Sequence, residues 1–242
     1  MNRTIIAILL TVCVANVQPL SAQRNWDVSG SGTWFSASNW SPIGVPSSAQ
    51  EALINNGGTA TATAGSASAR LLDVGQNGGT GHIDFNGAGM EIRNSLDIGD
   101  VESTFASSAG QNIVSEGTVA IRNADLIDIG TDGIGDLNVG QTSAANGAIA
   151  SGTGSLTLDS IGILRINGDL DVGQSSGTGM ATGSGTAMIS NITNQISVAD
   201  DIDVGQASAA AGGQNMGMGT ISLENIASLT IGADFDLGQV TG

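Results

Sequence analysis

One five-residue sequence recurs along this chain and constrains its fold more than any other feature. The copies at residues 72–76, 137–141, 170–174, 202–206 and 235–239 read apolar, Asp or Asn, apolar, Gly, Gln, and looser copies lie at 96–100 and 127–131. In a strand, the two apolar side chains point to one side and the polar one to the other. The glycine allows the left-handed or tight-turn conformation that ends the strand at a corner. Repetition of one strand-and-corner unit predicts a solenoid.

The spacing of apolar residues supports this prediction from residue 81 onward. Each repeat has seven apolar positions, three pairs and one single residue, and the second repeat carries an insertion before its last strand. In the third repeat they are Leu156, Leu158, Ile161, Leu164, Ile166, Leu170 and Val172. Like strands stacked on like strands predict an all-β, right-handed parallel β-helix of about five to six coils. An antiparallel sandwich is the alternative, but there each strand would have a different neighbour. We expect the segments after the glutamine, such as residues 175–184 and 207–219, to be mobile loops at one edge.

The chain divides into three parts. Residues 1–22 have the basic start, apolar run and small-residue exit of an export signal, with cleavage expected after Ala22, and the only cysteine, Cys13, lies within them. Residues 23–50 contain all three tryptophans and are predicted to cap the first coil, with a sugar-stacking face as the alternative. Residues 51–242 are the solenoid. They stop just after a signature copy, so we expect either further coils or a partner over that end.

Charge argues against some partners. The chain has 22 acidic and 6 basic residues, and removing Arg3 with the signal leaves a formal charge of 5 − 22 = −17. This excess repels phosphate backbones and anionic membranes, so we expect no nucleic-acid partner. The mature chain is also expected to have no transmembrane segment. The same charge attracts Ca²⁺ and other hard cations.

The outward position of the repeated unit is the main candidate site. Neighbouring carboxylates there would be either a solvated surface or a calcium ladder, for which Asp171, Asp203 and Asp236 are the candidate ligands. Asp97 and Asp128 occupy the same position in the looser copies, Asn138 replaces the acid in one copy, and Asp169, Asp201 and Asp234 add charge beside the column. No other cofactor is expected. The glutamines that follow the glycine are predicted to form an amide ladder from coil to coil.

The repeats also contain residue types that catalysis could use. A lyase needs a basic residue beside carboxylates, and Arg93, Arg122 and Arg165 occur in successive repeats. A hydrolase needs two carboxylates at a suitable spacing, which any acidic ladder offers. Catalytic residues normally occur where a repeat is broken, and no acidic or basic residue here differs clearly from its equivalents in the other repeats. We therefore assign no catalytic residue and keep a polysaccharide lyase or glycoside hydrolase as the alternative.

The tryptophan-rich start, with residues 39–42 reading Asn-Trp-Ser-Pro, precedes alanine-rich strands and Leu-Asp-Val-Gly-Gln copies. Together these resemble the exported, glycine-rich β-helical surface proteins of bacteria, of the autotransporter-passenger and PEP-CTERM-associated kind. The resemblance implies a secreted or cell-surface protein with a structural or adhesive function. It also implies partners among envelope or extracellular components, including polysaccharide. A calcium-dependent surface module is a further alternative.

Overall fold

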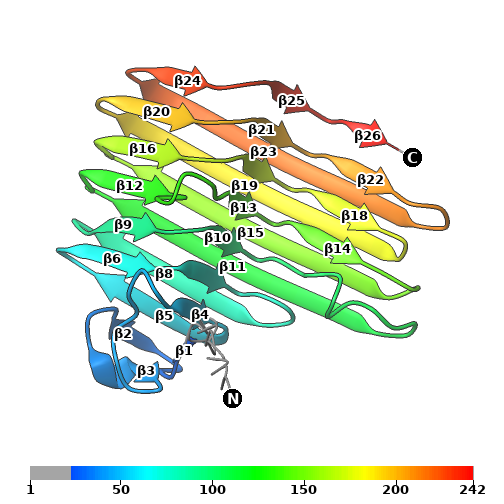
Figure 1. The fold of residues 1–242 in the computed structure, drawn as a ribbon, viewed down its shortest axis with the longest axis horizontal. Helices are drawn as coiled ribbons and strands as arrows, with labels where there is room; N and C mark the ends of the chain where they lie inside the picture. The colour runs from blue at the N-terminus through cyan, green and yellow to red at the C-terminus, as the bar shows by residue number, and fades with distance from the viewer. Residues whose placement is uncertain (1–22, 242) are drawn as a thin grey trace, which may run out of the picture.

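The computed structural model describes residues 23–241, which form an all-β parallel solenoid of about five turns. Figure 1 shows the coils stacked from the N-terminal segment to the last turn, with long strands behind and short strands in front. The only helical element among these residues is a single 3-10 turn, η1 (Ala37–Asn39). No helix in this part of the chain is long and apolar enough to cross a membrane.

The four coils from residue 112 onward each contribute one strand to each of four sheets, and the two coils before them contribute one strand to each of three. Sheet B contains β2 (Ser31–Thr33), β5 (Asn56–Ala62), β8 (Thr80–Asn86), β11 (Asn112–Arg122), β15 (Ile149–Asp159), β19 (Met180–Ile192) and β23 (Gln214–Ile226). Sheet C contains β6 (Ser66–Ala69), β9 (Gly89–Ile92), β12 (Leu126–Ile129), β16 (Ile163–Ile166), β20 (Gln195–Val198) and β24 (Leu229–Ile231). Sheet A contains β1 (Arg24–Trp26), β3 (Trp40–Ser41), β4 (Glu51–Ile54), β7 (Leu71–Val74), β10 (Leu96–Ile98), β13 (Leu137–Val139), β17 (Leu170–Val172), β21 (Ile202–Val204) and β25 (Phe235–Leu237). Sheet D contains β14 (Thr142–Ala144), β18 (Ser175–Gly177), β22 (Ala207–Ala209) and β26 (Val240–Thr241).

Equivalent residues of successive coils pair in register, which confirms the parallel solenoid. Leu158 pairs with Ile189, and Ile189 pairs with Leu223. The first two are 1% exposed and belong to one continuous apolar core. An antiparallel sandwich is therefore wrong, because like strands neighbour like strands throughout sheets B and C. Right-handed winding stays a prediction from the general preference of such crossovers.

The segments predicted to be mobile loops are strands instead. Residues 175–184 include β18 and the start of β19, and residues 207–219 include β22 and the start of β23. Together with β14, their small residues enclose a second core cluster beside the main one, built from Val101, Ala106, Ala144, Ala148, Ala150 and Ala181. The hydrogen bonds between parallel strands are made by backbone groups. Segments with small side chains can therefore form strands when the neighbouring coil provides a partner in the same register.

A narrow waist of glycines separates the two cores. Gly173 ends β17 with φ +72°, and a Cβ placed on it would lie 1.9 Å from the backbone oxygen of Met218 on the long strand opposite. A Cβ on Gly140 would meet Ser184 O at the same distance. Sheet A therefore approaches the middle of sheet B backbone to backbone, and only glycine permits this. The long strands β11, β15 and β19 contribute side chains to both cores and pass through this waist.

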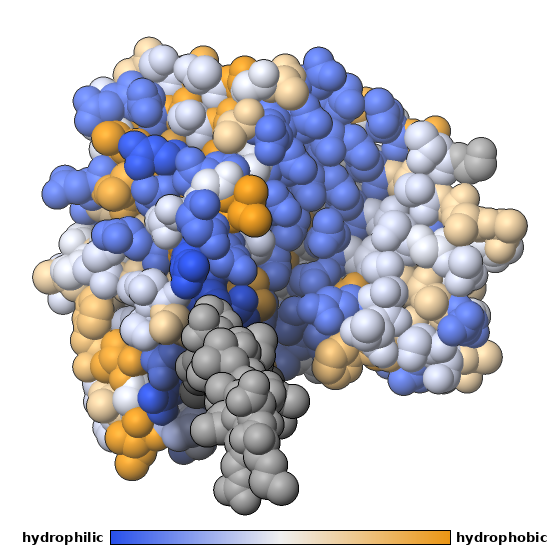
Figure 2. Space-filling model, in the orientation of Figure 1, coloured by the Kyte–Doolittle hydropathy of each residue, from blue (hydrophilic) through white to orange (hydrophobic). Residues whose placement is uncertain are grey.

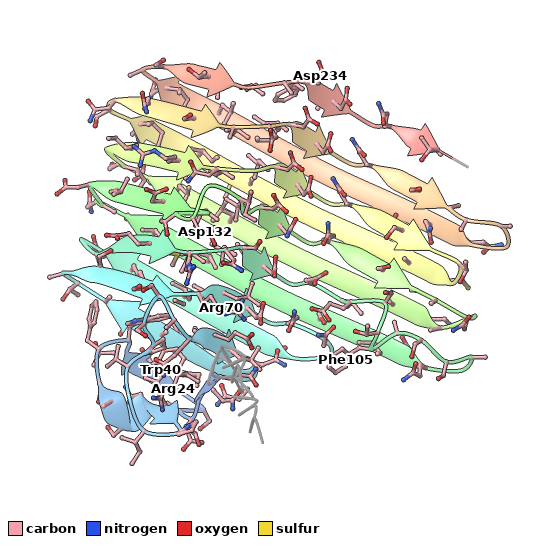
Figure 3. The ribbon with its side chains drawn as sticks, in the orientation of Figure 1. Arg24, Trp40, Arg70, Phe105, Asp132 and Asp234 are labelled. Atoms are coloured by element: carbon pink, nitrogen blue, oxygen red, sulfur yellow. The ribbon has the colours of Figure 1, made fainter. Side chains whose placement is uncertain are left out.

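The tryptophan-rich segment covers the first coil. Its strands β1 and β2 pair in parallel with β4 and β5, so it continues sheets A and B. Trp26, Trp34 and Trp40 are at most 3% exposed, and Trp34 packs edge-on against both Trp40 and Phe85. Figure 3 places Trp40 and Arg24 together at this end of the stack. Because the rings are buried in the core, they provide no sugar-stacking face.

Candidate functional site: an acid-lined groove

The waist creates a groove on the outer surface of the solenoid. Sheet A is drawn toward sheet B, so its outer face lies lower than the flanking sheets C and D. Figure 2 shows the resulting hollow between two lobes, with hydrophilic residues along it. The central side chain of each signature strand points outward and forms the floor of this groove.

The floor is a column of carboxyl and amide side chains in register. Asp73 pairs with Asp97, Asp97 with Asn138, and Asn138 with Asp171. The column continues from Asp171 to Asp203 and then to Asp236. The three predicted site residues, Asp171, Asp203 and Asp236, therefore lie on neighbouring strands.

Asp128 does not belong to this column, contrary to the sequence prediction. Its strand β12 belongs to sheet C, where Asp128 pairs with Glu91 on one side and Arg165 on the other. The local pattern around Asp128 copies the signature, but its place in the coil is one corner earlier. Arg165 Nη1 lies 2.7 Å from Asp128 Oδ2 and neutralises it.

The groove buries the column much more than a solvated surface would. Asp73 is 3% exposed, Asn138 8% and Asp171 8%. The prediction of a freely solvated acidic face is therefore wrong for these residues. The alternation within one strand shows that these side chains point outward. It does not show that they are buried, because their burial depends on how closely sheet A approaches sheet B at the waist.

The glutamines bind carboxyl groups rather than one another. Gln174 donates its amide to Asp171 Oδ1 at 2.5 Å, Gln206 donates to Asp203, and Gln239 donates to Asp236 Oδ2 at 3.1 Å. Gln76 donates to Glu102 Oε1 at 3.0 Å. The predicted amide ladder is wrong, because each of these amides has a carboxyl group within reach.

Burial changes the protonation of the floor. It raises the pKa of Asp171 to about 8, and the nearby carboxylates of Asp169 and Asp203 add to the rise. Burial and the neighbouring Asp97 raise the pKa of Asp73 well above its usual value. Burial also raises the pKa of Asp97 to about 6. Carboxyl groups in this groove therefore hold protons at pH values where surface aspartates are ionised.

A second acidic column runs beside the floor at the corner between sheets C and A. Asp136 Oδ1 accepts the backbone N–H of Asp169 at 3.0 Å, and Asp169 Oδ1 accepts that of Asp201 at 2.9 Å. Asp201 Oδ1 accepts that of Asp234 at 2.7 Å. Each acid thus stabilises the corner of the next coil, and Figure 3 shows Asp234 in the last turn. Of the acids expected to add charge beside the floor, Asp169 and Asp201 accept these structural hydrogen bonds through their side chains, and Asp234 donates its backbone N–H.

The predicted insertion in the second repeat borders the groove. It occupies residues 130–136, between β12 and β13. Asp132 of this segment lies 3.5 Å from Arg93 Nε, and Figure 3 shows Asp132 beside the stacked coils. Next to it is a pocket of about 320 Å³, lined by Asn94, Ser95, Ile134, Gly135, Asp136, Asn167, Gly168 and Asp200. The insertion therefore interrupts the repeat beside the groove.

Calcium binding at Asp171, Asp203 and Asp236 stays a prediction. Their stacking is as the ladder requires, and each has a glutamine amide or a neighbouring acid beside it. Within residues 23–241, no group of three or more histidine, cysteine, aspartate and glutamate side chains is arranged to hold a metal ion.

The arginines considered for catalysis lie away from the floor. Arg122 Nη1 is 2.6 Å from Asp84 Oδ1 on sheet B, while Arg165 and Arg93 pair with Asp128 and Asp132. Among the described residues, no salt bridge includes a member of the sheet A column. The floor is thus a repeating acid-and-amide surface.

Sequence reasoning missed the groove and its pocket. The signal that could have indicated them is the small-residue alternation of the long strands, such as Ala-x-Gly-x-Gly at residues 150–154 and 181–185. Comparisons with protein-family models, with curated proteins and with solved structures found no match to this chain.

Proposed function

We propose that this protein is an exported surface protein whose solenoid is a rigid structural and adhesive element, and whose groove binds extracellular polysaccharide. One observation carries the proposal: the polar groups of the groove floor repeat in register from coil to coil. A stack of equivalent contacts suits a polymer of equivalent units, because each coil can contact another unit of the same chain.

The chemistry of the floor supports a hydroxyl-rich ligand. A carboxyl group with a pKa of about 8, as at Asp171, is largely protonated at neutral pH and both donates and accepts hydrogen bonds. The pocket beside the groove adds further polar side chains, among them Ser95 and Asp200. These groups can form hydrogen bonds with sugar hydroxyls. Because a protonated floor carries fewer charges, the free-energy cost of removing water from it on binding is lower.

The export part of the proposal rests on residues 1–22, which lie outside the described residues. Mass spectrometry of secreted protein is expected to find an N-terminus at Gln23. A product that stays inside the cell with Met1 intact would contradict export.

The binding part is tested with a panel of purified neutral and acidic polysaccharides in affinity electrophoresis or calorimetry. Asp200→Trp fills the pocket at the groove, and Asp27→Trp places the same bulk on the exposed cap. We expect at least tenfold weaker binding for Asp200→Trp and no change for Asp27→Trp. Equal binding by both variants, or no binding of any polysaccharide, would overturn the proposal. The release of new reducing ends or unsaturated products would instead support the enzyme alternative.

A further inference from the structure

The outer face of sheet B has an uncharged region in a highly acidic protein. Along β15, β19 and β23 every second residue points outward, and none of the outward residues within 149–157, 180–188 and 214–222 is charged. We call this region the neutral face. Asp159 and Glu224 follow it at the C-terminal ends of their strands.

Several exposed apolar side chains gather on the neutral face. Met180 and Met188 are each 48% exposed, Met216 is 54% exposed and Met218 is 47% exposed. Ile149, at 43% exposed, pairs in register with Met180. Methionine side chains adapt to the surface they meet, and they are frequent at interfaces. The remaining positions are mainly serine and threonine, whose hydroxyls form hydrogen bonds of either polarity.

We propose that a second copy of this chain docks on the neutral face, through the same face of its own sheet B. Two copies with a formal charge near −16 repel each other, so they can approach closely only where both are uncharged. The acidic columns lie on the opposite side of the solenoid, in front of the long strands in Figure 1. A two-fold arrangement of sheet on sheet is self-complementary and closes after two copies. This inference is independent of the proposed polysaccharide binding.

The area of the neutral face indicates how tightly two copies can be expected to bind. Nine residues along three strands cover about 30 Å by about 14 Å, or roughly 400 Å² in the plane of the sheet. Val114 on β11, 59% exposed, lies in the same column as Ser151 and extends the face by part of a further strand. Two such faces fall in the class of weak, transient interfaces. The dimer is therefore expected to be weak, with a dissociation constant of about a micromolar or more.

Analytical ultracentrifugation of the purified protein from about 1 to about 500 µM tests this range of affinity. The double variant Met188→Asp/Met218→Asp puts charge on the face at exposed positions. Ile43→Asp makes the same change on the cap, where Ile43 is 79% exposed. We expect a monomer–dimer equilibrium for the unmodified protein, strengthened by NaCl because salt screens the acids. The double variant should weaken it at least tenfold, and Ile43→Asp should leave it within twofold.

A third variant separates this face from the last coil. Leu237 is 65% exposed on β25, and Leu237→Asp should leave the dimer unchanged. The proposal is overturned if the unmodified protein stays monomeric up to 500 µM, or if the double variant dimerises like the unmodified protein. Loss of the dimer in Leu237→Asp alone would also overturn it, because the contact would then lie at the last coil. Circular dichroism confirms that each variant is folded.

Discussion

The side-chain amide of Gln174 joins two successive coils of the groove floor. Its Nε2 lies 2.5 Å from Oδ1 of Asp171 and 3.4 Å from Oδ2 of Asp203 in the next coil. Gln206 repeats the bond to Asp203 one coil later. The glycine of the signature makes the groove, and the glutamine fixes the carboxyl groups within it.

Gln174→Leu removes this shared donor from a half-buried position. We expect it to lower the free energy of unfolding by about 1–2 kcal/mol, because the buried carboxyl of Asp171 loses its partner. Gln239→Leu is the matched variant, since Gln239 makes the same bond on the exposed last coil and should lose less than about 0.5 kcal/mol. Urea unfolding measures both, and equal losses would show that the bond between coils contributes nothing.

The raised pKa of Asp171 predicts an unusual dependence of stability on pH. The folded state holds its proton up to about pH 8, whereas the unfolded chain releases it near the ordinary value of about 4. Between these values the folded state binds more protons, so the free energy of unfolding falls as pH rises. The protein should be more stable at pH 5 than at pH 8.

Asp171→Asn tests the assignment. It removes the titrating group, so the slope between pH 5 and pH 8 should decrease by up to about 1.4 kcal/mol per pH unit. Asp27→Asn on the exposed cap should leave the slope as it is. Urea unfolding at pH 5, 6, 7 and 8 gives the slope, and a stability that rises with pH in the unmodified protein would contradict the buried column.

The waist predicts different effects for two glycines with the same conformation. Gly173 and Gly238 have φ +72° and +66°, but a Cβ on Gly173 meets Met218 O at 1.9 Å and one on Gly238 meets nothing within 4 Å. Gly173→Ala should lower the free energy of unfolding by about 3 kcal/mol or more, because the added methyl group forces the backbone at residue 173 away from the strand that contains Met218. Gly238→Ala should lower it by about 1 kcal/mol from backbone conformation alone. Thermal unfolding distinguishes them, and similar losses would exclude a close approach.

The cap predicts a large loss on truncating one ring. Trp34 is fully buried, and its carbonyl accepts the indole N–H of Trp40 at 2.8 Å. Trp34→Ala should lower the free energy of unfolding by about 3–5 kcal/mol. Phe35→Ala, next to it but 41% exposed, should lower it by less than about 1 kcal/mol. Unfolding followed by circular dichroism measures both, and an equal effect would contradict the packing of the cap.

The sequence is informative where large apolar residues alternate. Leu158, Ile189 and Leu223 share one position in the repeat, and this position alone predicts the column that they form. The small core could not be predicted in the same way, because Ala150 and Ala181 carry too little hydrophobicity to stand out among serines and glycines. Alternation of size, rather than of hydropathy, is the usable signal there.

The groove depends on contacts between distant parts of a coil. A strand pattern shows that Asp171 points away from the core, but its burial results from the approach of Gly173 to Met218, 45 residues later (218 − 173). Asp128 shows that the local pattern alone can also assign a strand to the wrong sheet. It has the signature pattern but lies in sheet C, and only the spacing between its strand and the following one reveals this.

Stacking of equivalent positions is most directly tested by a distance between spin labels along one outward column. Asp84, Ala120, Thr157, Met188 and Ser222 follow one another on sheet B. Spin labels at positions 84 and 222 should be about 20 Å apart, since four strand-to-strand steps of about 4.8 Å separate them. Pulsed electron paramagnetic resonance at low micromolar protein concentration measures this distance. A single distribution near that distance supports the solenoid. A mean beyond about 35 Å, well outside the same four steps, would contradict it.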